Sequence, residues 1–318
     1  MLKPILTMAF FVAALTIAGQ AQEDQGGRYQ PNRDLPWVTA EVKAPRIEFR
    51  SFESKIVGAK VSYHVYTPLA YDDPNSRLPV LYWLHGTEGG VSGVRRVAEL
   101  FHDAIQAKKQ PAMLVVFVNG LPRRLWADSK DGSAPVETVF VKELIPEVDK
   151  QYRTNAKREG RILEGFSMGG YGAARIGFKN PDLFAGVSIL AGGPLDLEFK
   201  GPRAIHNPML RKQILTEVCS SDMEYFKAIS PWLIAESSAE KLREQKMVIR
   251  QAVGSRDNTR DLNVKFHERM ESLKVPHEFV ELPEVTHDAK ALLDALGERN
   301  GKFYRRALGL ADPTRLID

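Results

Sequence analysis

Apolar and polar residues alternate along two early segments of the chain and give way to continuous apolar runs further on. The alternation at residues 47–49 and 60–66 predicts half-buried antiparallel strands. Continuous apolar runs are typical of strands that are buried on both faces of a parallel sheet. Such runs cover residues 78–84 and 113–118. We predict a further buried strand at 184–190, a later strand at 247–253, and shorter strand-like segments at 161–164 and 277–282.

Segments with helical spacing separate these strands. They cover residues 94–107, 139–148, 171–178, 262–273 and 288–296, and the second of them is interrupted at Pro146. Strands that alternate with helices predict an α/β fold with a mostly parallel, doubly wound central sheet flanked by helices. Residues 197–245 are helix-like but carry no strand pattern. We expect them to form a small helical insertion over the functional site.

The first 21 residues resemble an export signal. Lys3 provides a positive start, an apolar run follows, and Gly19 and Ala21 place small residues at a cleavage site. The run is short for a membrane span, so we predict cleavage after Ala21, a secreted or periplasmic protein, and no stable membrane anchor. There is no cysteine near the cleavage point, so we do not expect a lipid anchor. An uncleaved anchor and a buried helix remain as alternatives.

The rest of the chain suits one large domain. Residues 22–45 are polar and rich in proline, which predicts an exposed lead-in to a domain at residues 46–318. Cys219 is the only cysteine, so an internal disulfide is impossible. The net charge of +4 is too small to indicate nucleic-acid binding. The Arg-Arg pairs at 95–96, 123–124 and 305–306 are expected on solvated faces.

Residues 165–170, with the sequence Gly-Phe-Ser-Met-Gly-Gly, carry the most specific chemical signal. They place Ser167 between two glycines, after a strand and before a helix, as in a nucleophile elbow. The following helix contains three glycines, each costing about 1 kcal/mol relative to alanine, which indicates a helix pressed closely onto a sheet. The alternative is a glycine-rich turn in which the serine is incidental.

A serine nucleophile needs a base and an acid, which in an elbow fold follow it in the chain order serine, acid, histidine. His287 lies in a loop after the last predicted strand, so we favour it as the base over His206, His267 and His277. Asp257 follows the strand at 247–253 and is our candidate acid. Asp261 is the alternative, although it could instead cap the next helix.

An oxyanion that forms at the nucleophile needs two backbone N–H donors. The amide of Met168, directly after the serine, is the first candidate. A glycine-rich loop follows the strand at 78–84 and supplies the second, for which we predict Thr87 with Gly86 as the next choice. His85 precedes the serine in the chain and is therefore expected to be structural.

An ordered set of motifs resembles the esterase D and feruloyl esterase-like family of α/β-hydrolases. The motifs are Val65-Tyr66-Thr67-Pro68, Leu84-His85-Gly86, Trp126-Ala127-Asp128-Ser129, Glu137-Thr138-Val139, residues 165–172, Gly254-Ser255-Arg256-Asp257 and Thr286-His287-Asp288. The resemblance runs from about Phe49 to the end of the chain. It implies the α/β-hydrolase fold, Ser167, Asp257 and His287 as a triad, and Thr87 and Met168 at the oxyanion hole. Where the family often has an aromatic residue soon after the catalytic histidine, this chain has Ala289-Lys290-Ala291.

These observations lead to the hypothesis of a serine carboxylesterase that works through an acyl-enzyme. We predict neither a metal nor an organic cofactor, because no zinc-type spacing is present and residues 257–261 do not fit a calcium loop. The resemblance favours small-molecule or polysaccharide-linked esters, such as feruloyl or acetyl groups. An acyltransferase or a thioesterase would use the same triad. A peptidase and a non-catalytic binding module are further alternatives.

Overall fold

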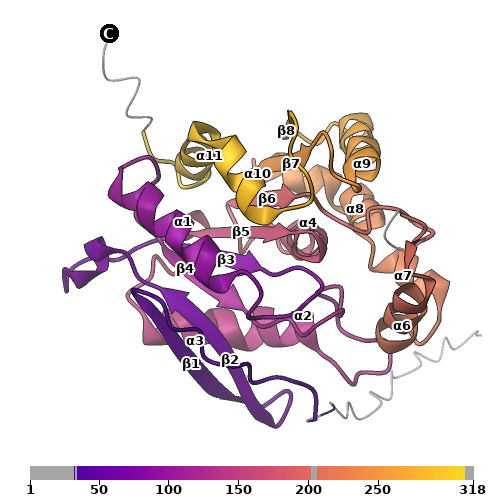
Figure 1. The fold of residues 1–318 in the computed structure, drawn as a ribbon, viewed down its shortest axis with the longest axis horizontal. Helices are drawn as coiled ribbons and strands as arrows, with labels where there is room; N and C mark the ends of the chain where they lie inside the picture. The colour runs from indigo at the N-terminus through magenta and orange to yellow at the C-terminus, as the bar shows by residue number, and fades with distance from the viewer. Residues whose placement is uncertain (1–31, 33, 202–205, 312–318) are drawn as a thin grey trace, which may run out of the picture.

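A computed structural model describes residue 32, residues 34–201 and residues 206–311 (Figure 1). The proposed signal peptide and most of the lead-in lie outside these residues. Eight strands form one sheet in the order β1-β2-β4-β3-β5-β6-β7-β8. The strands are β1 (Ile47–Ser54), β2 (Ala59–Tyr66), β3 (Val80–Leu84), β4 (Leu114–Val118), β5 (Arg161–Phe166), β6 (Gly186–Leu190), β7 (Val248–Gly254) and β8 (Glu278–Leu282).

Strand β2 runs antiparallel to both of its neighbours, β1 and β4, and β3 to β8 are parallel to one another. The mostly parallel sheet predicted from the apolar runs is confirmed. Every residue of β3 and β4 is buried, whereas exposed and less exposed residues alternate along the start of β1. This contrast follows from position, because β1 is an edge strand and the central strands are covered on both faces.

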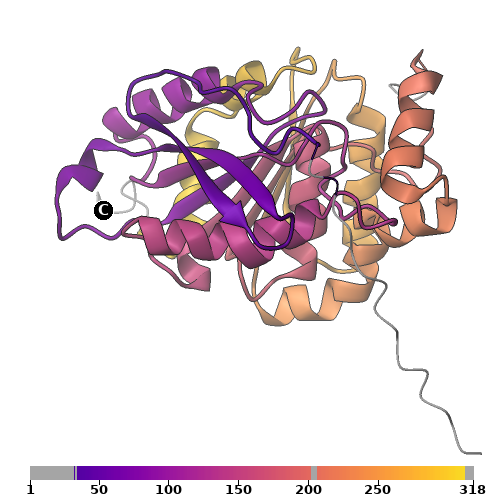
Figure 2. The ribbon, with the colours of Figure 1, turned by 90° about the horizontal axis from the view of Figure 1, so that it is seen from below.

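Helices cover both faces of the sheet (Figure 2). One face packs against α1 (Val94–Gln106), α10 (Ala289–Leu296) and α11 (Glu298–Ala307). The other packs against α2 (Val136–Val139), α3 (Ile145–Gln151), α4 (Met168–Lys179), α8 (Pro231–Glu244) and α9 (Arg260–Ser272). No helix among the described residues combines the length and apolar character needed to cross a membrane.

The helix around Pro146 differs from the expectation. Residues 136–151 form one helical stretch, in which the π-helical segment η2 (Phe140–Leu144) joins α2 to α3. Pro146 lies in the first turn of α3. The π turn changes the hydrogen-bond register directly before the proline, so the missing N–H and the ring are accommodated there. The predicted interruption is therefore wrong.

The helix-rich segment 197–245 divides into two parts. In Figures 1 and 2, α6 (Pro208–Cys219) and α7 (Met223–Ala228) lie at one end of the molecule, and their buried residues join the apolar cluster on the α4 side of the sheet. In contrast, α8 packs against α4 within the layer that covers the sheet. Only the first part of the segment, which includes α6, borders the pocket described below.

Candidate active site

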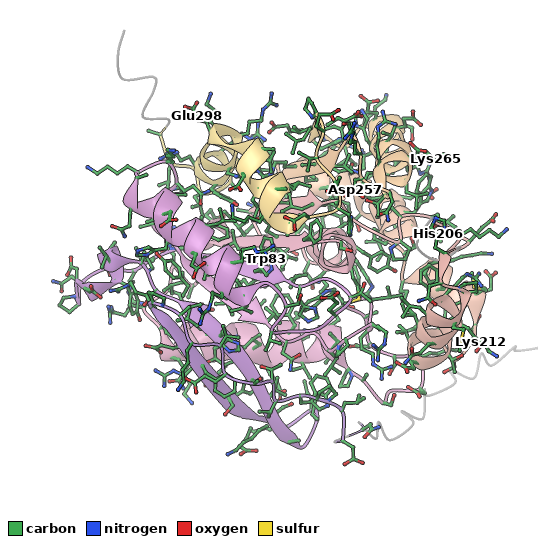
Figure 3. The ribbon with its side chains drawn as sticks, viewed as in Figure 1. Trp83, His206, Lys212, Asp257, Lys265 and Glu298 are labelled. Atoms are coloured by element: carbon green, nitrogen blue, oxygen red, sulfur yellow. The ribbon has the colours of Figure 1, made fainter. Side chains whose placement is uncertain are left out.

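A pocket of about 1430 Å³ opens at the carboxyl ends of the parallel strands. Ser167, Met168, Thr87 and His287 all line it. Its apolar lining includes Leu125, Phe199, Leu210, Ile214 and Leu262. Figure 3 labels Asp257 in the loop after β7 and His206 just before α6, on the side of the molecule where this pocket lies.

Ser167 occupies the sharp turn between β5 and α4. Its backbone has φ 60° and ψ −119°, a conformation that is costly for any residue with a Cβ. The turn also brings backbones together, since a Cβ on Gly169 would lie 1.9 Å from the carbonyl oxygen of Leu84. Farther along α4, a Cβ on Gly177 would lie 2.4 Å from Val187 Cγ2 on β6. The predicted close packing of this helix on the sheet is confirmed.

A chain of hydrogen bonds connects the serine to a histidine and an aspartate. Ser167 Oγ lies 2.9 Å from His287 Nε2, and His287 Nδ1 lies 2.8 Å from Asp257 Oδ2. An ionised carboxylate only accepts hydrogen bonds, so Nδ1 carries the proton and donates it to Asp257. This tautomer presents the Nε2 lone pair to the serine, whose hydroxyl donates.

Asp257 is enclosed behind the histidine, with its side chain fully buried. Burial alone would raise the pKa of the Asp257 carboxyl, but hydrogen bonds from His287 and from the amide and hydroxyl of Thr259 lower it below its usual range. The aspartate therefore stays charged and oriented. The ring of Phe166 packs on that of His287 at 4.6 Å between centroids, which restricts the imidazole. Thr259 and Phe166 were not among the predicted residues.

The alternative acid and bases considered from the sequence form other contacts or are exposed. Asp261 is exposed and forms an ion pair with Arg260 at 3.0 Å. His267 and His277 contact each other instead, with Nδ1 and Nε2 2.7 Å apart. His206 is exposed and lines the pocket.

The two backbone amides predicted as oxyanion donors belong to segments that border Ser167. Met168 begins α4, where the helix dipole is positive. Thr87 follows Gly86, and a Cβ on Gly86 would lie 3.6 Å from Ser167 Cβ. In the part of the chain that the structure describes, neither amide donates to a protein acceptor. Both amides therefore remain the candidate donors to an oxyanion that forms at Ser167.

Charged residues gather at the pocket mouth on α1. Arg95 and Arg96 are exposed there, as expected, and Arg96 pairs with Asp288 at 3.4 Å. Arg124 is different, because it is buried and pairs with Glu217 at 3.1 Å. The expectation that this arginine lies on a solvated face is wrong. No group of three metal-ligating side chains occurs within the described ranges.

Residues 54–292 match the model of the family described as "Putative esterase". The chain belongs to this family. An endo-1,4-beta-xylanase/feruloyl esterase of Xylanibacter ruminicola is 29% identical over 186 residues, which is 55% of this chain. The chain covers only 25% of the length of that relative.

Solved structures of esterases share the fold. A ferulic acid esterase has a TM-score of 0.66 and 24% identity, covering 81% of this chain and 97% of its own. An S-formylglutathione hydrolase from Agrobacterium tumefaciens has a TM-score of 0.66 and 16% identity, covering 85% and 99%. These similarities confirm the predicted α/β-hydrolase fold.

Proposed function

We propose that the protein is a serine carboxylesterase in which Ser167, His287 and Asp257 act as a catalytic triad. The observation that carries the proposal is the hydrogen-bonded chain from Ser167 Oγ through His287 to a buried, charged aspartate, at the wall of a large pocket. Membership of an esterase family supports the same reaction class.

In the first half-reaction, Ser167 Oγ attacks the ester carbonyl while His287 Nε2 takes its proton. Asp257 holds the imidazole in the required tautomer and stabilises its positive charge. The carbonyl oxygen becomes an oxyanion, for which the Thr87 and Met168 amides are the donors. His287 then gives the proton to the leaving alcohol, and an acyl-enzyme on Ser167 remains.

In the second half-reaction, water replaces the alcohol. His287 takes a proton from the water as its oxygen attacks the acyl carbon, and the same amides receive the second oxyanion. Collapse breaks the ester bond to Ser167, whose oxygen regains the proton from His287. The products are a free carboxylic acid and the starting enzyme. The pocket is broad and open at its mouth, which gives water a route to the acyl-enzyme.

For the substrate we propose feruloyl esters, or smaller acetyl esters, attached to plant polysaccharide. The xylanase/feruloyl esterase relative and the ferulic acid esterase structure support this class by their names. The pocket supports it by its size and by the apolar wall of Phe199, Leu210 and Ile214, which suits an aromatic acyl group.

We also propose that the protein is exported and that residues 1–21 are removed. Secretion would bring the enzyme to polysaccharide outside the cell. Expression of the full chain in a bacterial host, followed by fractionation and N-terminal sequencing of the exported protein, tests this. A mature N-terminus at Gln22 supports the proposal, and retention of Met1 in the exported or membrane fraction contradicts it.

The enzymatic proposal is tested with a fluorophosphonate label and a substrate panel. We expect one adduct on Ser167 and hydrolysis of p-nitrophenyl acetate and methyl ferulate. Ser167→Ala should lose the adduct and the hydrolysis of both esters. Ser92→Ala is the matched control, because Ser92 lines the same pocket and its hydroxyl bonds Glu88 at 3.2 Å. Thioesters, peptides and added acceptor alcohols complete the panel. The absence of an adduct on folded protein would sink the proposal, and transfer to alcohol in preference to water would identify an acyltransferase.

A further inference from the structure

His85 is a buried histidine whose two ring nitrogens are both engaged. Only 2% of the residue is exposed, at the start of the loop that carries Thr87. The amide of Gly120 donates to His85 Nε2 at 3.0 Å. A backbone N–H can only donate, so Nε2 is the acceptor and the ring proton is on Nδ1. His85 Nδ1 therefore donates to the carbonyl oxygen of Gly86, at 2.6 Å.

The acceptor of this bond belongs to the same peptide group as the candidate oxyanion donor. The carbonyl of Gly86 and the N–H of Thr87 lie in one planar peptide unit, and in a trans peptide they point in opposite directions. Holding the Gly86 oxygen toward His85 consequently holds the Thr87 N–H away from it. The histidine thus sets the direction of an amide that it does not itself touch.

Other contacts fix His85 and the loop after β4 against each other. Trp126 Nε1 donates to the His85 carbonyl oxygen at 3.1 Å, and the two rings lie 4.7 Å apart. The amide of Arg123 donates to the Thr87 carbonyl oxygen at 3.1 Å. Trp126 is itself wedged against the elbow helix, since a Cβ on Gly172 would lie 2.4 Å from its Cγ. These contacts connect the loop that carries Thr87, the tryptophan and the elbow helix α4.

We propose that His85 is a positioning residue for the oxyanion hole, which orients the Thr87 N–H through its hydrogen bond to the Gly86 carbonyl. The inference rests on the proposed esterase function. It requires a neutral imidazole, and burial lowers the pKa of His85 to about 4. The ring is therefore neutral under ordinary assay conditions. Because both nitrogens are committed to backbone groups, His85 is not a base for the substrate.

Two substitutions test the two hydrogen bonds of the His85 ring one at a time. In His85→Asn the amide nitrogen occupies the place of Nδ1 and keeps the donor to Gly86. In His85→Gln the side chain reaches the place of Nε2 and keeps the acceptor for Gly120, but it loses the donor. An oxyanion donor is worth about 10²–10³ in kcat. We expect His85→Gln to lower kcat by about 10- to 100-fold with KM within about twofold, and His85→Asn to stay within about fivefold of the wild type.

His64→Gln is the matched control. His64 is also a buried histidine, its Nε2 accepts from the amide of Val42 at 3.0 Å, and it lies on β2 away from the serine. We expect it to lower stability without changing kcat per active site, counted by the fluorophosphonate endpoint. Equal losses of kcat in His85→Gln and His85→Asn, or an unchanged kcat in His85→Gln, would overturn the inference.

Crystal structures of the wild type and His85→Gln give a readout that does not depend on turnover. We expect the Gly86–Thr87 peptide to rotate in the variant, and an unchanged orientation overturns the inference even if activity falls. Failure of the proposed function looks different, since the wild type itself would then neither label at Ser167 nor hydrolyse an ester.

Discussion

Strands β5 and β7, with the loops that follow them, each contribute to two polar clusters with opposite character. The site cluster consists of Ser167, His287 and Asp257. The sheet cluster consists of Glu164, Ser188, Arg250, Asn300 and Tyr304. Arg250 and Glu164 are fully buried, with Arg250 Nη2 2.7 Å from Glu164 Oε2. The site cluster lies in loops beyond the strand ends and faces a pocket, whereas the sheet cluster lies within the sheet and the helix that covers it.

The sheet cluster is closed because its members satisfy each other. Arg250 donates to Glu164, Ser188 and Asn300, and Tyr304 donates to the remaining Glu164 oxygen at 2.9 Å. The Arg250 guanidinium also lies 4.4 Å from the ring centre of Phe303. Only two residues separate Glu164 from Ser167 along the chain. Similar polar groups therefore satisfy one another inside the sheet and face a pocket just beyond its carboxyl edge, which is where open α/β sheets bind their ligands.

The largest expected effect is the loss of activity when the serine or the histidine of the site cluster is removed. Ser167→Ala and His287→Ala should each lower kcat by about 10⁶, because triad members act as a unit. For the same reason, the double variant should be no worse than either single one. Initial rates with p-nitrophenyl acetate measure this. Losses that multiply in the double variant would show that the two side chains act independently.

The acid of the site cluster should matter less than its serine. Asp257→Asn keeps the size of the side chain but favours the wrong tautomer of His287, and it should lower kcat by about 10⁴. Asp261→Asn is the matched control, since Asp261 is exposed and bonded to Arg260. It should leave kcat unchanged. If the two variants behave in reverse, Asp261 is the acid and the proposed triad is wrong.

The sheet cluster should respond to substitution in stability and not in chemistry. Arg250→Met leaves Glu164 charged and buried without its partner, and this should destabilise the fold by about 3–5 kcal/mol. Urea denaturation measures the loss, and the rate per labelled site should stay near the wild-type value. Arg260→Met removes a surface pair with Glu281 and should leave the denaturation midpoint unchanged. A stable Arg250→Met protein with low turnover per site would contradict the division between the two clusters.

The site cluster could be predicted from the sequence because its signals are local. The spacing of Gly165, Ser167 and Gly169 is typical of one sharp turn between a strand and a helix. The order of strands and loops then selects one aspartate and one histidine. In the structure the histidine contacts the serine and the aspartate contacts the histidine. The catalytic roles of these residues stay predictions until the variants are measured.

The sheet cluster could not be predicted because its partners are remote in the chain. Arg250 lies in a predicted strand, and its partners Asn300 and Tyr304 come from α11, a segment for which the sequence pattern predicts no helix. The surface of α11 is strongly charged, which hides its buried face. The supports of the site share this limit, since His85 meets Gly120 and Trp126 only once the sheet is assembled.

The smallest expected effect is a change in stability that depends on the backbone conformation of one serine in each cluster. Ser167 has φ 60° and ψ −119°, which costs a residue with a Cβ about 1–3 kcal/mol. Glycine avoids this cost but loses about 0.5–1 kcal/mol to its greater freedom in the unfolded chain. Both variants lack the hydroxyl, so they differ only in the Cβ. Ser167→Gly should therefore be more stable than Ser167→Ala by about 1 kcal/mol.

Ser188 on β6 provides the opposite case for thermal or urea denaturation. It lies in regular strand structure, so Ser188→Gly should be less stable than Ser188→Ala by about 1 kcal/mol. A reversed sign at the two serines shows that strain is stored at the site and absent from the sheet. If glycine destabilises both positions equally, the turn at Ser167 holds no strain, and its geometry then follows from the surrounding packing at no cost to stability.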